Sequence, residues 1–253
     1  MTLLMQTSGL CRYFGGVRAI HELDLEVREG LIQSVIGPNG AGKTTLFNVV
    51  SGILPPTSGK VYFKGAPIGG MAPHRIASMG MTRTFQNLQL FSDMTVLENV
   101  MVGMHLRSMG GFFASAFKLP LVWKEERRIR ENSMEILEFT GLAGYAPSIA
   151  GSLPFGRQRV LEIARALAAE PELLMLDEPA AGLNNRETSD LSQLIDLIRE
   201  RGITILLVEH DMDLVMEISE RVTVLDQGMK ISEGDAETVR NDEKVLKAYL
   251  GEE

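Results

Sequence analysis

One short glycine-rich stretch constrains the fold of this chain more than any other feature. It follows an apolar run at residues 31–36 and leads into a helix-forming run at residues 45–50. Its residues are Gly37, Pro38, Asn39, Gly40, Ala41, Gly42, Lys43, Thr44 and Thr45. The pattern G-x-x-x-x-G-K-[ST], with a strand before it and a helix after it, predicts a phosphate-binding loop.

The residue types of this stretch suit a bound polyphosphate. Glycines adopt backbone angles that other residues resist, so successive N–H groups can converge on an anion at the positive end of a helix. We expect Lys43 near the β- and γ-phosphates and the Thr44 hydroxyl on a Mg²⁺ ion. The alternative is a glycine-rich turn that contains Lys-Thr by chance, and the strand–loop–helix context favours the phosphate loop.

Composition limits the class of protein and its partners. The 253 residues are 45% hydrophobic and 23% charged, which is typical of a globular protein with one large domain or two small ones. The net charge of −8 argues against a nucleic-acid partner, because binding along a phosphate backbone needs a basic field. The single cysteine, Cys11, cannot form an internal disulfide, which fits a reducing compartment.

The sequence contains no pattern that predicts export or membrane insertion. Residues 1–7 are too short for the apolar core of an export signal, and no run of about twenty apolar residues follows. The most apolar unexplained segment is 110–123, which Lys118 and Pro120 interrupt. We interpret it as a loop or short helix packed on the domain rather than a segment lying on a membrane.

Hydrophobic patterns predict a mostly parallel sheet. Residues 23–27 alternate between apolar and acidic, as in a half-buried strand, and residues 61–63 indicate a second strand. The run 31–36 is apolar apart from Gln33 and Ser34, and the runs 173–176 and 203–208 are almost wholly apolar, as in strands buried on both faces. Because open α/β sheets bind ligands beyond the carboxyl ends of their strands, we expect these three strand ends to converge on the phosphate site.

Helical periodicity dominates the middle of the chain. Asn184 is a predicted N-cap, with Glu187 three residues later. Three apolar faces are predicted, made of Ile129, Ile136 and Leu137; of Val160, Ile163, Ala164, Leu167 and Ala168; and of Leu191, Leu194, Ile195 and Ile198. We find no internal repeat or long linker. We therefore predict one domain spanning 1–253, with a helical subdomain at about 88–160 inserted into a core made of 1–87 and 161–253.

An acidic pair follows the predicted strand at 173–176. Asp177 is placed to hold Mg²⁺ from the side opposite Thr44, and Glu178 to polarise an attacking water. Acidic pairs at strand ends are often only solvated turns. The phosphate loop makes the chemical interpretation much the stronger one.

Over essentially its whole length the chain resembles the ATP-binding subunits of ABC transporters. The resemblance rests on five motifs in the expected order, namely the phosphate loop at 37–45, Thr84-Phe85-Gln86-Asn87, the region 151–159, residues 174–179 and Val208-Glu209-His210-Asp211. It implies an α/β fold of the P-loop NTPase, ABC type, with a mostly parallel sheet, an antiparallel β subdomain and an inserted helical subdomain. ATP and Mg²⁺ are the implied cofactors.

The resemblance also implies roles for matching residues. Phe14 would stack on adenine, although Tyr13 beside it is an alternative. Gln86 would contact Mg²⁺ or the attacking water and report on a transmembrane partner. Glu178 would be the catalytic base. His210 would bridge the γ-phosphate and the opposite subunit, the alternative being a polar strand cap. The implied catalytic group is Glu178, His210, Gln86 and Lys43, the implied Mg²⁺ ligands are Thr44, Gln86 and Asp177, and residues 180–184 would cross a dimer interface.

One motif departs from the family. The usual signature is Leu-Ser-Gly-Gly-Gln, and the corresponding residues here are Leu153, Pro154, Phe155, Gly156 and Arg157. Pro154 has neither the serine hydroxyl nor a backbone N–H, whereas Gly156 and the following helix N-terminus can still donate. Because this signature completes the ATP site of the other subunit, we hypothesise an asymmetric dimer with a different ATPase chain. The alternative is that backbone N–H groups suffice and both sites hydrolyse.

Within the family, the sequence is most similar to the larger ATP-binding subunit of branched-chain amino acid importers. Supporting stretches are 84–91, 95–100, the insert around 104–130, 178–184 and the ending Ala248-Tyr249-Leu250-Gly251. The resemblance implies a second ATPase subunit, two transmembrane permease subunits, a periplasmic or extracellular binding protein, and a peripheral place on the cytoplasmic face of the bacterial inner membrane. Leu88, Leu90 and Phe91 are candidates for the groove that receives a membrane subunit, or for local core packing.

Two other kinds of function remain open at the sequence level. The first is an ABC ATPase for urea or amide import, or for lipopolysaccharide or lipid export. The second is an ABC ATPase that works without a membrane partner. Such proteins usually carry two cassettes or long coiled-coil inserts, and neither pattern occurs here.

Overall fold

The computed structural model describes residues 2–104 and 120–250. The apolar segment 110–123 and the insert around 104–130 therefore lie largely outside the described residues. Only the backbone of residues 120–123 is described within that apolar segment. Our interpretation of the segment stays a prediction.

The strands form two sheets. A four-stranded antiparallel sheet has the order β2-β1-β4-β5, and a six-stranded sheet has the order β10-β9-β3-β8-β7-β6. The second sheet is parallel except for its edge strand β10. The strands are β1 (Leu3–Phe14), β2 (Val17–Arg28), β3 (Ile32–Ile36), β4 (Ser58–Phe63), β5 (Ala66–Pro67), β6 (Met81–Arg83), β7 (Leu173–Asp177), β8 (Thr204–Val208), β9 (Arg221–Asp226) and β10 (Met229–Gly234).

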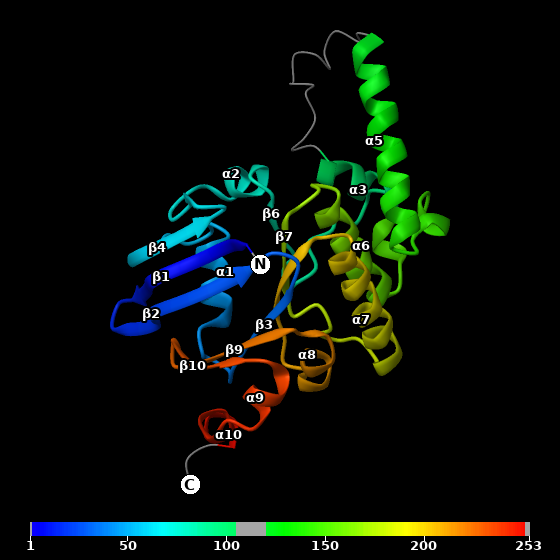
Figure 1. Cartoon of the computed structure of the whole chain (residues 1–253). Coiled ribbons are helices and arrows are strands. Elements are labelled where there is room, and N and C mark those ends of the chain that lie inside the picture. Colours follow the sequence, from blue (N-terminus) through cyan, green and yellow to red (C-terminus); the bar gives the residue numbers. More distant parts are fainter. Residues whose placement is uncertain (1, 105–119, 251–253) are drawn as a thin grey trace.

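Helices lie around the parallel sheet (Figure 1). Those of the described residues are α1 (Lys43–Val50), α2 (Pro73–Ser78), α3 (Val96–Gly103), α5 (Pro120–Phe139), α6 (Phe155–Leu167), α7 (Asn185–Glu200), α8 (Met212–Ile218), α9 (Ala236–Arg240) and α10 (Glu243–Leu250), with short 3-10 helices η2 (Ala143–Tyr145) and η3 (Ala150–Ser152). The helix after the phosphate loop begins at Lys43, two residues before the run that predicted it. The predicted capping box of Asn184 and Glu187 is confirmed at the start of α7.

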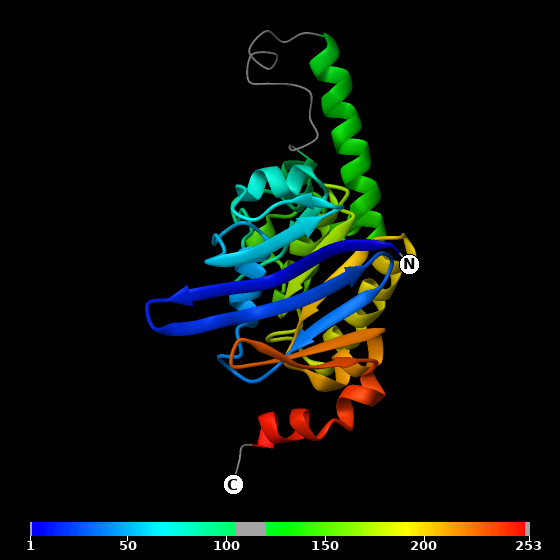
Figure 2. The same ribbon diagram turned by 60° about the vertical axis from the view of Figure 1, so that its left-hand side comes forward.

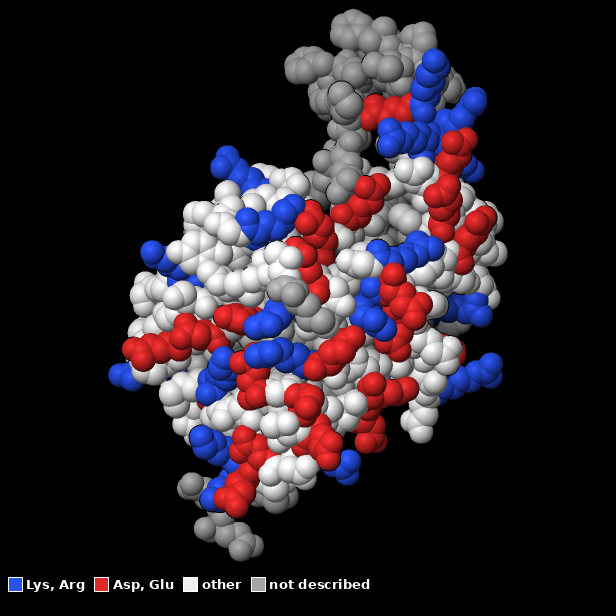
Figure 3. Space-filling view, viewed as in Figure 1, with Lys and Arg blue, Asp and Glu red and all other residues white. Residues whose placement is uncertain are grey.

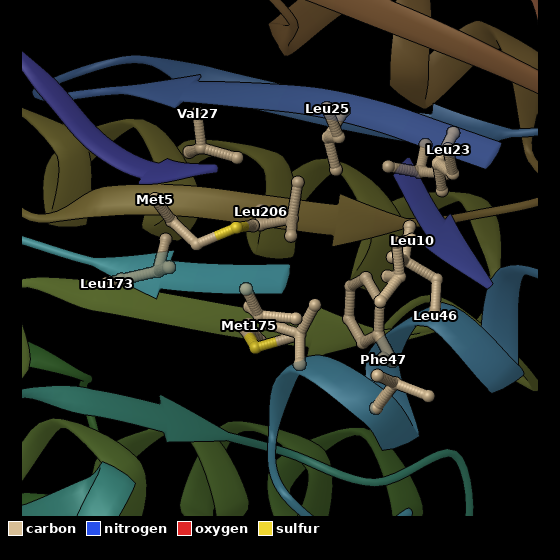
Figure 4. Packing of buried hydrophobic residues seen from close by; sticks show 14 of the residues in the cluster. Met5, Leu10, Leu23, Leu25, Val27, Leu46, Phe47, Leu173, Met175 and Leu206 are labelled. Atoms are coloured by element: carbon tan, nitrogen blue, oxygen red, sulfur yellow. The ribbon is translucent and has the colours of Figure 1, made fainter. Parts of the chain in front are cut away.

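The main core lies between the two sheets. Figure 4 shows side chains of β1 and β2 facing those of β7 and β8, with Leu46 and Phe47 of α1 among them. In β2 the residues at 23, 25 and 27 are buried and those at 24 and 26 exposed, which confirms the predicted alternation. Burial of apolar side chains such as these is the dominant favourable contribution to folding.

A second core covers the opposite face of the parallel sheet. Along β7, Leu173 and Met175 face the main core, whereas Leu174 and Leu176 pack against α6, α7 and α8. All residues of β3, β7 and β8 are buried, as the apolar runs predicted. These strands are neighbours in the order β3-β8-β7, so their carboxyl ends meet at one edge of the sheet.

A smaller core forms between α3, α5 and α6. It contains Val96, Val100, Leu137 and Leu161, and a capping box of Thr95 and Glu98 starts α3. The first half of α5 projects away from the rest of the molecule (Figures 1 and 2). Because α6 continues through residue 160 and also packs on the parallel sheet, the helical subdomain and the core share this helix. The subdomain boundaries at 88 and 160 stay a prediction.

The surface carries both signs of charge. Figure 3 shows acidic and basic side chains interspersed over the face in view, including along α5. In the part of the chain that the structure describes, every helix is too short or too polar to cross a bilayer.

Candidate functional site

The phosphate loop passes through a gap that admits only glycine at two positions. A Cβ atom added to Gly37 would lie 2.1 Å from the carbonyl oxygen of Leu225, and one added to Gly42 would lie 2.4 Å from that of Ala19. Both residues also have positive φ angles, 151° and 104°. The tight fit between β9 and β2 therefore gives a physical reason for these two glycines.

Lys43 is folded into the loop. Its Nζ atom donates to the carbonyl oxygens of Gly37 at 2.7 Å and Pro38 at 3.0 Å, and the residue is 5% exposed. Burial lowers the pKa of Lys43, and the carboxylates of Glu178 and Asp177 oppose that shift. The ammonium group is thus largely removed from water but satisfied by carbonyls, which is a suitable setting for a cation that meets a phosphate.

An open cleft of about 700 Å³ lies over this loop. The predicted residues Gln86, Glu178 and His210 all line it, although they come from distant parts of the chain. The other lining residues are Val17, Arg18, Ala19, His21, Asn39, Gly40, Ala41, Gly42, Lys43, Thr44, Thr45, Gln227 and Met229. The cleft is large enough for a nucleotide-sized ligand.

Glu178 lies at the centre of a hydrogen-bonded group. Its Oε1 atom is 2.6 Å from Nε2 of His210, and its Oε2 atom accepts from Nε2 of Gln86 at 2.8 Å. Its φ angle of 49° places a non-glycine residue in the left-handed region, which costs on the order of 1–3 kcal/mol. The surrounding contacts hold it there, including the bond from its N–H to the carbonyl of Val208 at 2.8 Å.

Asp177 has one carboxylate oxygen bound and one without a hydrogen-bond partner. Oδ2 accepts from the guanidinium of Arg83 at 2.6 Å in a buried ion pair, whereas Oδ1 is buried and unbonded among the described residues. Arg83 also donates to Asn48 and Ser51, and its guanidinium lies 5.3 Å from the centre of the Phe47 ring and 5.2 Å from that of Phe85. Sequence reasoning missed Arg83. The pattern that could have indicated it is a cationic residue in β6, the strand that pairs with β7, which ends at the Asp177 carboxylate.

The adenine-stacking assignment is not tested by these contacts. Phe14 is 44% exposed, and the guanidinium of Arg12 lies 4.5 Å above the centre of its ring. The hydroxyl of Tyr13 is 2.8 Å from Nδ1 of His21, which does line the cleft. Within the described residues, neither Phe14 nor Tyr13 lines the cleft itself. The choice between them stays a prediction.

The five predicted signature residues lie at the start of α6, outside the cleft lining. Leu153 is buried, and Pro154 is the N-cap of α6, without a capping side-chain bond. Phe155 is 46% exposed, and the guanidinium of Arg157 lies 4.0 Å from the centre of the Tyr145 ring. A Cβ on Gly156 would lie 2.5 Å from a carboxylate oxygen of Glu187, so the start of α6 packs closely on α7.

A buried ion pair attaches α6 to the loop that carries Gln86. Arg159 donates to the carbonyl of Phe85 at 3.0 Å and to that of Gln86 at 2.9 Å, and it pairs with Glu162 at 3.0 Å. Glu162 in turn accepts from the N–H groups of Phe85 and Gln89. Burial raises the pKa of Glu162, and Arg159 opposes the shift. This attachment was not predicted, because in the sequence Arg159 and Glu162 look like ordinary charged residues on the exposed face of a helix.

A glycine-rich phosphate loop over a mostly parallel sheet, with a carboxylate and an imidazole at neighbouring strand ends, defines a P-loop nucleotide-binding cassette. The sequence model of the family described as ABC transporter matches residues 20–181. The chain belongs to this family and is an ATP-binding cassette that hydrolyses ATP. The model described as branched-chain amino acid ATP-binding cassette transporter matches residues 229–253.

Individual relatives agree with that membership. The chain is 46% identical over 98% of each chain to the high-affinity branched-chain amino acid transport ATP-binding protein BraF of Pseudomonas aeruginosa. It is 44% identical, also over 98% of each chain, to the corresponding LivG protein of Escherichia coli K12. A solved nucleotide-free ATP-binding cassette from an ABC transporter superposes with a TM-score of 0.86 at 33% identity, covering 99% of this chain and 100% of that one.

Proposed function

We propose that this chain is the ATP-hydrolysing subunit of an importer for branched-chain or other hydrophobic amino acids. The observation that carries the proposal is similarity over nearly the whole length of both chains to BraF and LivG, whose names state that transport. The match of residues 229–253 to a branched-chain amino acid transporter model supports it from a part of the chain outside the phosphate loop. The transported solute would contact other polypeptides rather than this cassette.

The residues around Asp177 fit a bound Mg²⁺ ion. Oδ1 of Asp177 is buried without a hydrogen-bond partner in the described chain, and Thr44 and Gln86 line the cleft. Hydroxyl, amide and carboxylate oxygens are the ligands that Mg²⁺ prefers together with phosphate oxygens. Bound there, the ion would neutralise charge on the β- and γ-phosphates.

The remaining polar residues of the cleft have roles that follow from their chemistry. Glu178 would accept a proton from the water that attacks the γ-phosphate. Gln86 and His210, which contact its two oxygens, would orient that carboxylate and the water. Lys43 would exchange its carbonyl partners for phosphate oxygens. Catalysis of this kind needs positioning and charge neutralisation rather than covalent chemistry.

The start of α6 would serve a second ATPase subunit. Phe155 and Arg157 are both exposed, so these residues are available to a neighbouring chain. Since Pro154 has no N–H or hydroxyl to donate, the site completed by this chain would be the weaker of two. We therefore favour pairing with a different ATPase chain over pairing with a second copy.

An apolar groove is the proposed docking site for the membrane subunits. It has a volume of about 510 Å³ and is lined by residues of α2, β6, α3 and α6, among them Ile76 and Val102, and by Phe85 and Phe91 of the segment between β6 and α3. Of the three residues predicted for this role only Phe91 lines it, whereas Leu90 packs on the core of the helical subdomain. The groove adjoins the segment that carries Gln86.

In an importer with two permease subunits and an external binding protein, this chain would lie on the cytoplasmic face of the membrane.

The test is ATPase activity of the purified chain, alone and reconstituted with the ATPase and membrane subunits encoded beside it. We expect turnover that rises in the assembly and rises again with a binding protein loaded with leucine. An assembly that carries Glu178→Gln is the control for contaminating ATPases. Vigorous turnover of the chain alone, indifferent to membrane subunits and to leucine, would exclude the importer and favour an ABC ATPase without a membrane partner.

A further inference from the structure

Glu209 is a buried carboxylate outside the group of residues proposed to bind or hydrolyse ATP. It is the first residue after β8 and is 3% exposed. Its Oε1 atom accepts from the backbone N–H of Ala180 at 2.6 Å, and its Oε2 atom accepts from that of His210 at 2.9 Å. A third N–H, that of Asp211, lies 3.5 Å from Oε2. One side chain thus accepts hydrogen bonds from backbone N–H groups of two separate segments of the chain.

The bound N–H groups belong to two different loops. Ala180 is in the loop after β7, residues 178–184, and His210 is in the loop after β8, residues 209–211. The same two loops carry the carboxylate of Glu178 and the imidazole of His210, whose atoms lie 2.6 Å apart. Glu178 is also held at a positive φ angle, which requires firm support from its surroundings.

A carboxylate is well suited to this position. Both oxygens of an ionised carboxylate accept, whereas an amide of the same size has only one accepting atom and two donors. Burial raises the pKa of Glu209, the charge of Glu178 raises it further, and the three backbone N–H groups oppose the shift. Such a costly buried acid is unusual unless its hydrogen bonds are needed.

We propose that Glu209 is a positioning residue for ATP hydrolysis, which clamps the loop after β7 to the loop after β8 and so holds Glu178 in register with His210. The proposal rests on the roles proposed for these two residues. It does not depend on which solute the transporter carries. A loosened clamp leaves the phosphate loop and the adenine side of the cleft intact, so it should impair the chemical step more than ATP binding.

The experiment compares Glu209→Gln with the wild type in the reconstituted assembly. We expect kcat to fall about ten- to a hundredfold, because small displacements of reacting groups have effects of this size, with KM for ATP within about twofold. Glu209→Asp keeps both accepting oxygens and should lose less. Glu217→Gln, an exposed residue on α8, is the matched control and should behave as the wild type. Melting temperatures identify variants that fail to fold.

A double variant separates positioning from general structural support. If Glu209 acts through Glu178 and His210, adding Glu209→Gln to a His210→Ala background should lower kcat little further. An unchanged kcat in Glu209→Gln, or a full additional loss in the double variant, would overturn the proposal. Retained turnover in Glu178→Gln would instead overturn the assigned base, and an absent response to leucine would overturn only the importer.

Discussion

The cleft and the start of α6 are both expected to contact ATP, and they are built in opposite ways. Glu178 lines the cleft and Asp177 lies behind it, and both are buried and bonded to other side chains of the same chain, namely Gln86, His210 and Arg83. At the start of α6, in contrast, Phe155 is 46% exposed and the N-cap Pro154 has no capping bond. The first region is organised within one subunit. The second exposes Pro154, Phe155 and Arg157, whereas Leu153 and Gly156 are buried.

The difference fits the proposal that one chain holds one organised half of the nucleotide site. Strand ends of a buried sheet hold side chains rigidly, so the hydrolytic group can be positioned before a partner arrives. The exposed signature residues Phe155 and Arg157 would contact another subunit only in the proposed assembly. We infer that ATP turnover depends on assembly, and that substitutions in the two regions will differ in size and in what they change.

The largest effect should come from Glu178→Gln. Loss of a general base lowers turnover by roughly 10²- to 10⁴-fold, while the phosphate loop that binds ATP is unchanged. Steady-state ATPase assays and fluorescent-nucleotide titration of the same preparation measure both quantities. Turnover within a few-fold of the wild type would show that the cleft is organised around another base.

The buried ion pair behind the cleft should matter for stability. Arg83→Leu leaves the Asp177 carboxylate without its partner, and breaking such a pair costs about 3–5 kcal/mol. Denaturant unfolding of the isolated chain measures the change. As a control, Arg28→Ala breaks an exposed pair with Glu26 and should cost no more than about 1 kcal/mol. Equal losses in the two variants would contradict the contrast between buried and exposed pairs.

Pro154→Ser tests the outward-facing region directly. The restored hydroxyl should raise ATP turnover of the assembly by about two- to tenfold, the worth of one hydrogen bond, and leave nucleotide binding to the isolated chain unchanged. Pro147→Ser, in an exposed turn before η3, is the matched control. No change in turnover would count against a weakened second site and support a dimer in which backbone N–H groups suffice.

The smallest effect concerns α7, on which the start of α6 packs. Asn184 caps α7 by accepting from the N–H groups of Arg186 and Glu187, so Asn184→Ala should lower the free energy of unfolding by about 1 kcal/mol. Gln193→Ala on the exposed face of α7 should stay within about 0.5 kcal/mol. Thermal and denaturant unfolding check both values. A neutral Asn184→Ala would mean that tertiary packing alone fixes the start of α7.

The local sequence pattern was enough to predict the buried strands and the start of α7. The runs at 173–176 and 203–208 form strands because a continuous apolar sequence suits burial on both faces. The capping box of Asn184 and Glu187 was predictable because it spans only one helical turn. The edge strand β10 and the terminal helices α9 and α10 were not predicted, since they are short and partly exposed. Apolar periodicity is weak in elements that bury only one or two residues.

The sequence by itself determined the phosphate loop, the buried strands and the acidic or imidazole residue types at their ends. Tertiary structure alone decided which of these side chains meet. Arg83 and Asp177 are 94 positions apart, and Ala180 and Glu209 are 29 apart. Contacts at such separations follow from the order and register of the parallel strands, which pair through their backbones and leave no periodic signal in the residues that come together.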